Sequence, residues 1–388
     1  MLKRELYIPP SDGDNALWLS GCGYTDAGSS RIETIMCSDR SDVYKEHKYR
    51  TSNDNGKTWT DFRPLDNMIF KGEKGGMVVY GGNYYFDAIK EILYHPVMRR
   101  IWHNVPFYTM PWDSDNKHPF YDHTFIVENG NVEKLMKYES GSDWDVNKYP
   151  DLEFLKHNMS YLGNSVALHN DGTAFFPMIC NTVDENENWT GGVVLMRRDV
   201  ATGDWTASNQ QHIDPILSSR GLQEPDAVVL NNNRILIVCR GSSTATTPGR
   251  KWFTISDDNG KSIAPVMEFR HDDGTSFYSP SSIHRFIRSS KNGRLYWLAN
   301  IVSKPPSNGR PRYPLCICEI DEEKTAVKKE TVTVVDDRCK NEPELLQLSN
   351  FHALENRESL NIEIYMPRLG EDPARPHYSG IYKYVFSP

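Results

Sequence analysis

The chain has 388 residues, of which 38% are apolar and 25% charged, and its net charge at pH 7 is −8. This composition is typical of a soluble globular protein, and no run approaches the roughly 20 apolar residues that cross a bilayer. The acidic charge is spread evenly without a basic stripe, so nucleic-acid binding is not expected. The start, MLKRELYIPP, lacks the apolar core of a signal peptide. Compartment and oligomeric state stay open.

Short alternating runs separated by turn residues predict antiparallel β structure along the whole chain. Residues 6–8 are expected to form a strand that joins the last sheet. The best helical period, FDAIKEILYHPVM, covers residues 86–98. The seven Cys form no CxxC pair, so we expect neither a disulfide framework nor a Cys metal site, and no cofactor is indicated.

Strand–turn–strand units repeat along the chain and predict a β-propeller. Units of roughly 65 residues suit radial repetition of four-stranded blades. The fold class is therefore all-β, a six-bladed propeller in one domain over residues 1–388, although the weak pattern at 87–116 leaves room for a seventh blade. The clearest hairpins and the strand pairs that follow them cover 165–179 with 191–207, 225–240 with 251–263, 282–300 with 313–327, and 352–366 with 379–386.

One eight-residue turn, SNDNGKTW at 52–59, has a Ser-x-Asp-x-Gly-x-Thr-Trp pattern. Asp54 can bond backbone amides, Gly56 can take a positive φ, and Trp59 can pack under the loop. A weaker copy, SDDNGKSI, lies at 256–263. This pattern is the Asp-box, or BNR repeat, so the chain resembles the sialidase-type propeller superfamily. The turn residues themselves are expected to be structural.

The resemblance points to a site at the propeller axis, on the face opposite the tight turns. Glu224 and Arg240 are equidistant from the turn at Asn232, which predicts that they face each other across a hairpin. Sialidases carry a catalytic Glu and a substrate-binding Arg in this pattern. Arg312, or Arg310 in its place, resembles a further sialidase Arg that binds the substrate carboxylate.

The sequence also departs from the sialidase pattern. At the position of the nucleophilic Tyr it reads QLSNFHAL, and the N-terminal Arg-Ile-Pro signature is absent. Tyr278 is the nearest stand-in for that nucleophile. His284, predicted to face Asn300, and His352 are candidate proton donors because His titrates near neutral pH. Further candidate binding residues are Asn300, Asn164, His123 and Asn350, and no ligand spacing supports a metal site.

The main hypothesis is a glycosidase that acts on a carboxylated or otherwise anionic sugar, such as a sialic or uronic acid. Two alternatives remain. A uronate lyase would use the same Arg residues to neutralise the carboxylate while His or Tyr removes a proton. A non-catalytic propeller would only bind carbohydrate. The expected partner in each case is a carbohydrate.

Overall fold

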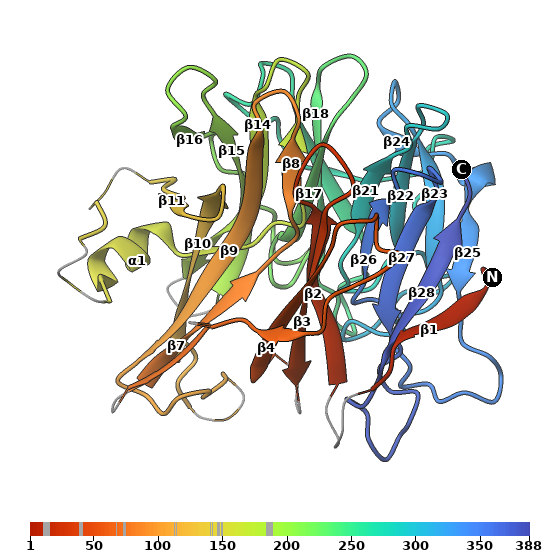
Figure 1. Ribbon diagram of the computed structural model, residues 1–388, viewed down its shortest axis with the longest axis horizontal. Coiled ribbons are helices and arrows are strands. Elements are labelled where there is room, and N and C mark those ends of the chain that lie inside the picture. The colour runs from red at the N-terminus through yellow and green to blue at the C-terminus, as the bar shows by residue number, and fades with distance from the viewer. Residues whose placement is uncertain are drawn as a thin grey trace.

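The computed structural model describes residues 1–388 except 11–15, 39–41, 67, 73–74, 112, 114, 140, 142, 146–147, 149 and 184–188. Within these described residues, six antiparallel sheets form the blades of a propeller (Figure 1). The predicted six-bladed architecture is confirmed, and the strands described within 87–116 belong to blade two instead of a seventh blade.

The first three blades follow one another along the chain. Blade one contains β2 (Ala16–Tyr24), β3 (Arg31–Ser38), β4 (Glu46–Ser52) and β5 (Arg63–Pro64). Blade two contains β6 (Ile69–Gly72), β7 (Gly75–Gly81), β8 (Tyr85–Asp87), β9 (Ile92–His103), β10 (Phe120–Glu128) and β11 (Val132–Leu135). Blade three contains β12 (Ser160–Tyr161), β13 (Ala167–Leu168), β14 (Ala174–Val183), β15 (Trp189–Arg198) and β16 (Trp205–Ala207).

The other three blades complete the ring. Blade four contains β17 (Gln223–Val229), β18 (Ile235–Arg240), β19 (Lys251–Ser256) and β20 (Met267–Glu268). Blade five contains β21 (Arg285–Arg288), β22 (Leu295–Asn300), β23 (Leu315–Asp321), β24 (Ala326–Val327), the 3₁₀-helix η1 (Lys329–Thr331) and β25 (Thr333–Asp336). Blade six contains β26 (His352–Glu355), β27 (Ile362–Pro367) and β28 (Ile381–Phe386).

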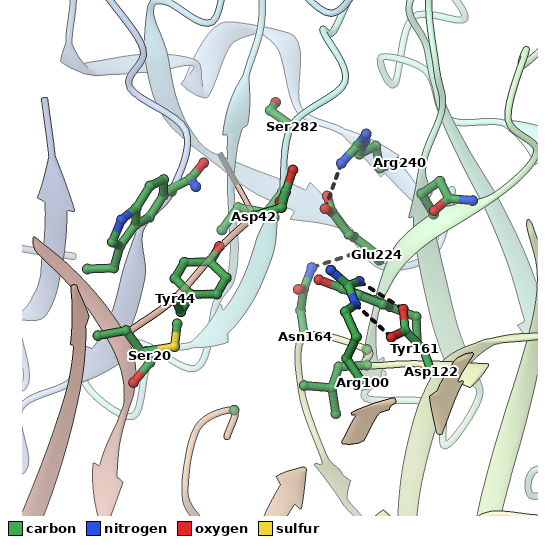
Figure 2. A pocket seen from close by; sticks show the side chains of 18 of the residues that line it. Ser20, Asp42, Tyr44, Arg100, Asp122, Tyr161, Asn164, Glu224, Arg240 and Ser282 are labelled. Carbon is green, nitrogen blue, oxygen red and sulfur yellow. Dashed lines mark hydrogen bonds and ion pairs between the residues drawn. The ribbon is translucent and has the colours of Figure 1, made fainter. Parts of the chain in front are cut away.

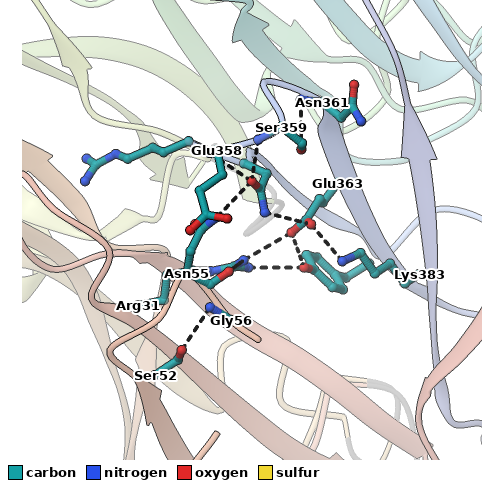
Figure 3. A network of polar contacts seen from close by, with 12 residues as sticks. Arg31, Ser52, Asn55, Gly56, Glu358, Ser359, Asn361, Glu363 and Lys383 are labelled. Carbon is teal, nitrogen blue, oxygen red and sulfur yellow. Dashed lines mark hydrogen bonds and ion pairs between the residues drawn. The ribbon is translucent and has the colours of Figure 1, made fainter. Parts of the chain in front are cut away.

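The ring is closed by the N-terminal strand β1 (Arg4–Ile8), which pairs with β28 as expected from the sequence (Figure 1). A buried polar network then joins blade one to blade six (Figure 3). Arg31 of blade one donates to Glu363 at 3.2 Å and to the Tyr365 hydroxyl at 3.1 Å, while Lys383 donates to Glu363 at 2.7 Å. The two blades are thus joined by charges as well as by apolar contacts.

Apolar packing fills the space between neighbouring blades. Leu236 and Phe253 of blade four pack with Trp297 of blade five, and Leu298 of blade five packs with Ile364 of blade six. Side chains alternate along each strand, so each central strand has one row of apolar residues for each neighbouring blade. These contacts between neighbouring blades hold each sheet with one edge strand toward the axis of the ring.

The Ser52–Trp59 turn follows β4 and is held by its own side chains. Asp54 accepts from the Thr58 amide at 2.9 Å and from the Thr58 hydroxyl at 2.6 Å. The Gly56 amide donates to Ser52 at 2.8 Å, and Gly56 has a φ of 80°. Trp59 donates to the Gly56 carbonyl at 3.1 Å. These are local contacts that shape a turn.

The turn after β19 repeats this pattern. Asp258 accepts from the Ser262 amide at 2.9 Å and from its hydroxyl at 2.6 Å, and the Gly260 amide donates to Ser256 at 2.9 Å. Ile263 stands where the first turn has Trp59 and is buried.

The helix predicted over residues 86–98 is wrong. That segment forms β8, a turn and β9, and Pro96 lies inside β9 opposite Ile126 of β10. Proline in a helix interior removes a hydrogen bond and clashes with the preceding turn, which favours the extended form. The α-helix of the described chain is α1 (Leu152–Asn158), which starts at an Asp151 cap and lies at the periphery beside blade two (Figure 1). No helix among the described residues is long and apolar enough to cross a membrane.

Candidate active site

A cavity of about 460 Å³ opens at one end of the propeller, and residues from all six blades line it. The lining comes from the starts of first strands, the ends of second strands and the loops next to them. This is the end of the ring where the sequence analysis expected a site. Among its described residues the cavity has five arginines, Arg100, Arg220, Arg240, Arg285 and Arg312, and three acidic residues, Asp42, Asp122 and Glu224.

Glu224 and Arg240 meet at the cavity wall (Figure 2), with Arg240 Nη1 2.6 Å from Glu224 Oε1. Their strands do not pair as the sequence suggested, because Gln223 is the residue opposite Arg240 and a bulge follows it. Glu224 itself has a φ of 41°. A bulge leaves an extra residue unpaired and redirects its side chain, so the two groups meet without a direct cross-strand pair.

The environment of Glu224 favours its ionised form. Burial would raise its pKa, but the ion pair with Arg240 and the charges of Arg312 and Lys251 outweigh burial and hold the pKa below its ordinary value. Oε2 of Glu224 is buried and has no hydrogen-bond partner among the described residues. A carboxylate in this state can accept a proton from a ligand or from water.

Lys251 lies directly behind this pair. It is opposite Arg240 on β19, is fully buried, and donates its ammonium to the Ser282 carbonyl. Burial, with repulsion from Arg240, lowers the pKa of Lys251 to about 7. This part of the protein therefore concentrates more positive charge than Glu224 balances.

Asp42 approaches the cavity from the loop between β3 and β4 of blade one (Figure 2). Its carboxylate is exposed and acts electrostatically on Arg220, Arg312 and Tyr161. Asp42 therefore brings a negative charge to a cavity whose lining is rich in guanidiniums.

A buried ion pair forms the wall from blade two. Arg100 donates through Nε and Nη2 to both oxygens of Asp122, each at 2.8 Å. Tyr161 of blade three lies beside this pair and below Glu224 (Figure 2), and its phenol interacts electrostatically with Glu224. Burial raises the pKa of Tyr161 above its usual range, so its hydroxyl stays protonated at neutral pH.

Several residues singled out from the sequence line the cavity. Besides Glu224, Arg240 and Arg312, these are Asn164, Asn350 and His352. Asn164 donates to the backbone carbonyls of Glu224 and His284, at 3.1 Å each, so it orients the wall. The ring of His352 lies 2.6 Å from Asn83 Oδ1. Burial, with the charge of Arg285, lowers the pKa of His352 to about 3.

Other candidates lie outside the described cavity lining. His284 is fully buried and accepts from the Trp297 indole at 3.2 Å, and its strand register places Leu298 opposite Arg285, so His284 does not face Asn300. Asn300 is also buried and donates to three backbone carbonyls, which is a structural arrangement.

The same holds for three more candidates. His123 is buried in an aromatic environment, with its ring stacked on Trp144. Tyr278 lies under the guanidinium of Arg250, 4.0 Å from the ring centroid. Arg310 is exposed and donates to the Leu345 carbonyl at 3.2 Å.

The cavity also contains residues that sequence reasoning missed, chiefly Asp42, Arg220 and Tyr161. The first two stand in loops without periodicity, and Tyr161 follows a helix that was not predicted. One usable signal was position, because Asp42 lies between the second and third strands of blade one, at the end of the ring where Glu224 lies. No group of three or more His, Cys, Asp or Glu among the described residues could hold a metal ion.

Comparison with known proteins gives a structural likeness only. No protein-family model and no curated protein matches the chain. A protein of unknown function from Dyadobacter fermentans is similar in structure, with a TM-score of 0.62, 11% identity and 98% of each chain covered.

Two glycoside hydrolases are also similar. A Hadza microbial sialidase has a TM-score of 0.55 and 13% identity over 96% of this chain and 66% of its own. The GH93 α-L-arabinofuranosidase of Fusarium graminearum, solved with arabinobiose, has a TM-score of 0.52 and 10% identity over 98% and 96%. The chain therefore has the six-bladed β-propeller fold that these sialidase and arabinofuranosidase structures share.

Proposed function

We propose that this protein is a glycoside hydrolase that acts on a carboxylated sugar, of the sialic or uronic acid type, in the axial cavity. The observation that carries the proposal is the excess of positive charge in the cavity lining. A chain of net charge −8 lines this cavity with five guanidiniums and three carboxylates among the described residues. An anionic ligand would balance that excess.

Arg240 and Arg312 are the proposed carboxylate-binding groups. Arg312 donates through Nε to the Gly309 carbonyl at 3.2 Å and forms no ion pair within the described part of the chain. Burial, together with repulsion from Arg240, lowers its pKa to about 10, so it is still charged at neutral pH. Planar guanidiniums match a carboxylate with paired hydrogen bonds, which supports this assignment.

Glu224 and Asp42 are the proposed catalytic pair. Glu224 is ionised and has an unpaired oxygen, so it suits the base that takes a proton from water or from the Tyr161 phenol. The oxygen so activated attacks the anomeric carbon as the glycosidic bond breaks. The leaving oxygen then takes a proton from Asp42. Where Tyr161 has attacked, a water molecule displaces the tyrosyl oxygen from the anomeric carbon, giving a proton to Asp42, and Glu224 returns its proton to the phenolate.

Asp42 replaces the histidines as the proposed donor. His284 is buried outside the cavity lining, and His352 is neutral above a pH of about 3. A neutral imidazole at working pH is a poor general acid. Asp42 is the exposed carboxyl among the described residues of the cavity lining, and it is therefore the proposed source of the proton.

The test is a panel of 4-methylumbelliferyl glycosides of N-acetylneuraminic acid, glucuronic acid and the neutral sugar arabinofuranose. We expect hydrolysis of an acidic glycoside and little of the neutral one. Glu224→Gln and Asp42→Asn should each lower kcat by at least about 100-fold. Glu358→Gln, an exposed carboxylate outside the cavity, is the matched control and should retain activity.

Three outcomes would reject the proposal. Turnover of the neutral substrate alone would reject an acid sugar. An unsaturated product absorbing in the ultraviolet would identify a lyase. Binding of an acid sugar by both wild type and Glu224→Gln, with turnover by neither, would identify a carbohydrate-binding protein.

A further inference from the structure

Arg220 enters the cavity from a loop between blades three and four whose backbone is firmly held. Its carbonyl accepts from the Gly191 amide at 3.0 Å and from Gln223 Nε2 at 2.8 Å. Gly221 has a φ of 68°, and a Cβ there would lie 2.1 Å from the Gly191 carbonyl oxygen. Only glycine fits this close approach, so the loop fixes where the Arg220 side chain starts.

The guanidinium of Arg220 is not neutralised. It lines the cavity at an exposed position and forms no hydrogen bond or ion pair with any residue that the structure describes. Its main charged neighbours are Arg240, Glu224 and Asp42. Glu224 is already engaged by Arg240 at 2.6 Å. Arg220 is therefore available to an anion from outside.

Arg312 is the second cavity guanidinium that forms no ion pair among the described residues, with its Nε donating to the Gly309 carbonyl at 3.2 Å, and it stands apart from Arg220. The backbone of Arg220 is held against blade three, where its carbonyl accepts from the Gly191 amide, whereas the backbone of Arg312 is held beside the start of blade six, where its carbonyl accepts from the Leu348 amide at 2.9 Å. Around the ring, Arg220 comes before blade four, which carries the Glu224–Arg240 pair, and Arg312 comes after it, in the loop before β23 of blade five.

We infer that the cavity binds two anionic groups at once, one on Arg240 with Arg312 and the other on Arg220. The ligand class is a sugar acid that carries a second negative group, either the carboxylate of an adjoining sugar acid or a sulfate ester. This inference rests on the proposed function and narrows its substrate class. One charge-assisted hydrogen bond to each group would supply the selectivity.

Isothermal titration calorimetry at fixed salt tests the inference. The single-charge probes are the methyl glycosides of N-acetylneuraminic acid and glucuronic acid. The double-charge probes are the glycosidically linked dimer of each acid and a sulfate ester of each methyl glycoside. The dimers and the sulfate esters show separately which source of the second charge is accepted.

Wild type should bind a double-charge probe about 10- to 100-fold tighter than its single-charge counterpart. Arg220→Gln should lose that gain while its affinity for the single-charge probe stays within about twofold, which also shows that the variant is folded. Arg270→Gln removes an equal charge at an exposed site outside the cavity and should keep the gain.

The outcomes separate the two levels of the argument. If a single-charge probe binds but the second charge adds nothing, or the gain persists in Arg220→Gln, the two-anion inference is wrong and the proposed function stands. If no single-charge probe binds wild type, the proposed function fails and this inference fails with it.

Discussion

Replacing the buried lysine behind the site should stabilise the protein in a pH-dependent way. Lys251 is fully buried, and burial with repulsion from Arg240 lowers its pKa from the ordinary 10.5 to about 7. The unfolded chain therefore holds the proton of Lys251 more tightly than the folded chain does. Folding stability rises with pH between about 7 and 10.5 on account of this group, and the full penalty applies below pH 7.

The size of the effect follows from these values. A pKa lowered from 10.5 to about 7 corresponds to about 5 kcal/mol. Lys251→Met also removes the bond to the Ser282 carbonyl, a loss of about 1–3 kcal/mol. The variant should therefore be about 2–4 kcal/mol more stable than wild type at pH 6. Above pH 10.5 it should be less stable by the lost hydrogen bond.

Urea unfolding of both proteins at pH 6, 8 and 10.5 measures this difference directly. Lys261→Met is the control, because it makes the same replacement at an exposed position in the turn after β19. If the difference in the free energy of unfolding between Lys251→Met and wild type did not change with pH, the folded protein would hold the charged lysine at no cost in stability. The assignment of excess positive charge behind Glu224 would then be wrong.

Three further changes test the ring, the Arg220 loop and the histidine. Glu363→Ala removes the shorter ion pair of buried Arg31, which keeps only the 3.8 Å ion pair with Glu33 beside its bonds to neutral groups, and should destabilise the protein by about 3 kcal/mol in urea unfolding. Gly221→Ala should clash with Gly191, lower the melting temperature and weaken binding of double-charge ligands. His352→Gln should leave the shape of the pH–rate profile between pH 5 and 8 unchanged, because the His352 pKa is about 3.

The fold could be predicted from sequence because blades are built from local signals. Alternation with period two and turn residues identify each hairpin, and repetition identifies the ring. Blade two was the weak point, since the apolar spacing at 86–98 fits both a helix and a strand. Pro96 within that segment was the sequence signal against a helix. The helix α1 has seven residues, too short to show a clear period.

The site was partly predictable for a similar reason. The sixteen-residue separation of Glu224 and Arg240 across a hairpin turn is a local pattern, and the structure brings their charged groups to 2.6 Å. Asp42 and Arg220 lie in loops of other blades, and only the closed ring brings them to the same cavity. Residues such as His284 looked equivalent to His352 because both stand near the start of a strand. The closed ring separates them, because His352 lines the cavity whereas His284 is fully buried outside its lining.

The bulge at Glu224 explains why the ion pair between Glu224 and Arg240 forms although the strand register predicted from the sequence was wrong. Regular antiparallel pairing would put Glu224 opposite Arg240, but the structure puts Gln223 there and turns Glu224 to a φ of 41°. A positive φ at a residue other than glycine costs about 1–3 kcal/mol and persists only where contacts hold it. The Arg240 ion pair and the Asn164 bond to the Glu224 carbonyl supply those contacts. The local rule is thus broken at the residue proposed as the base, so its strained backbone directs the carboxylate into the cavity.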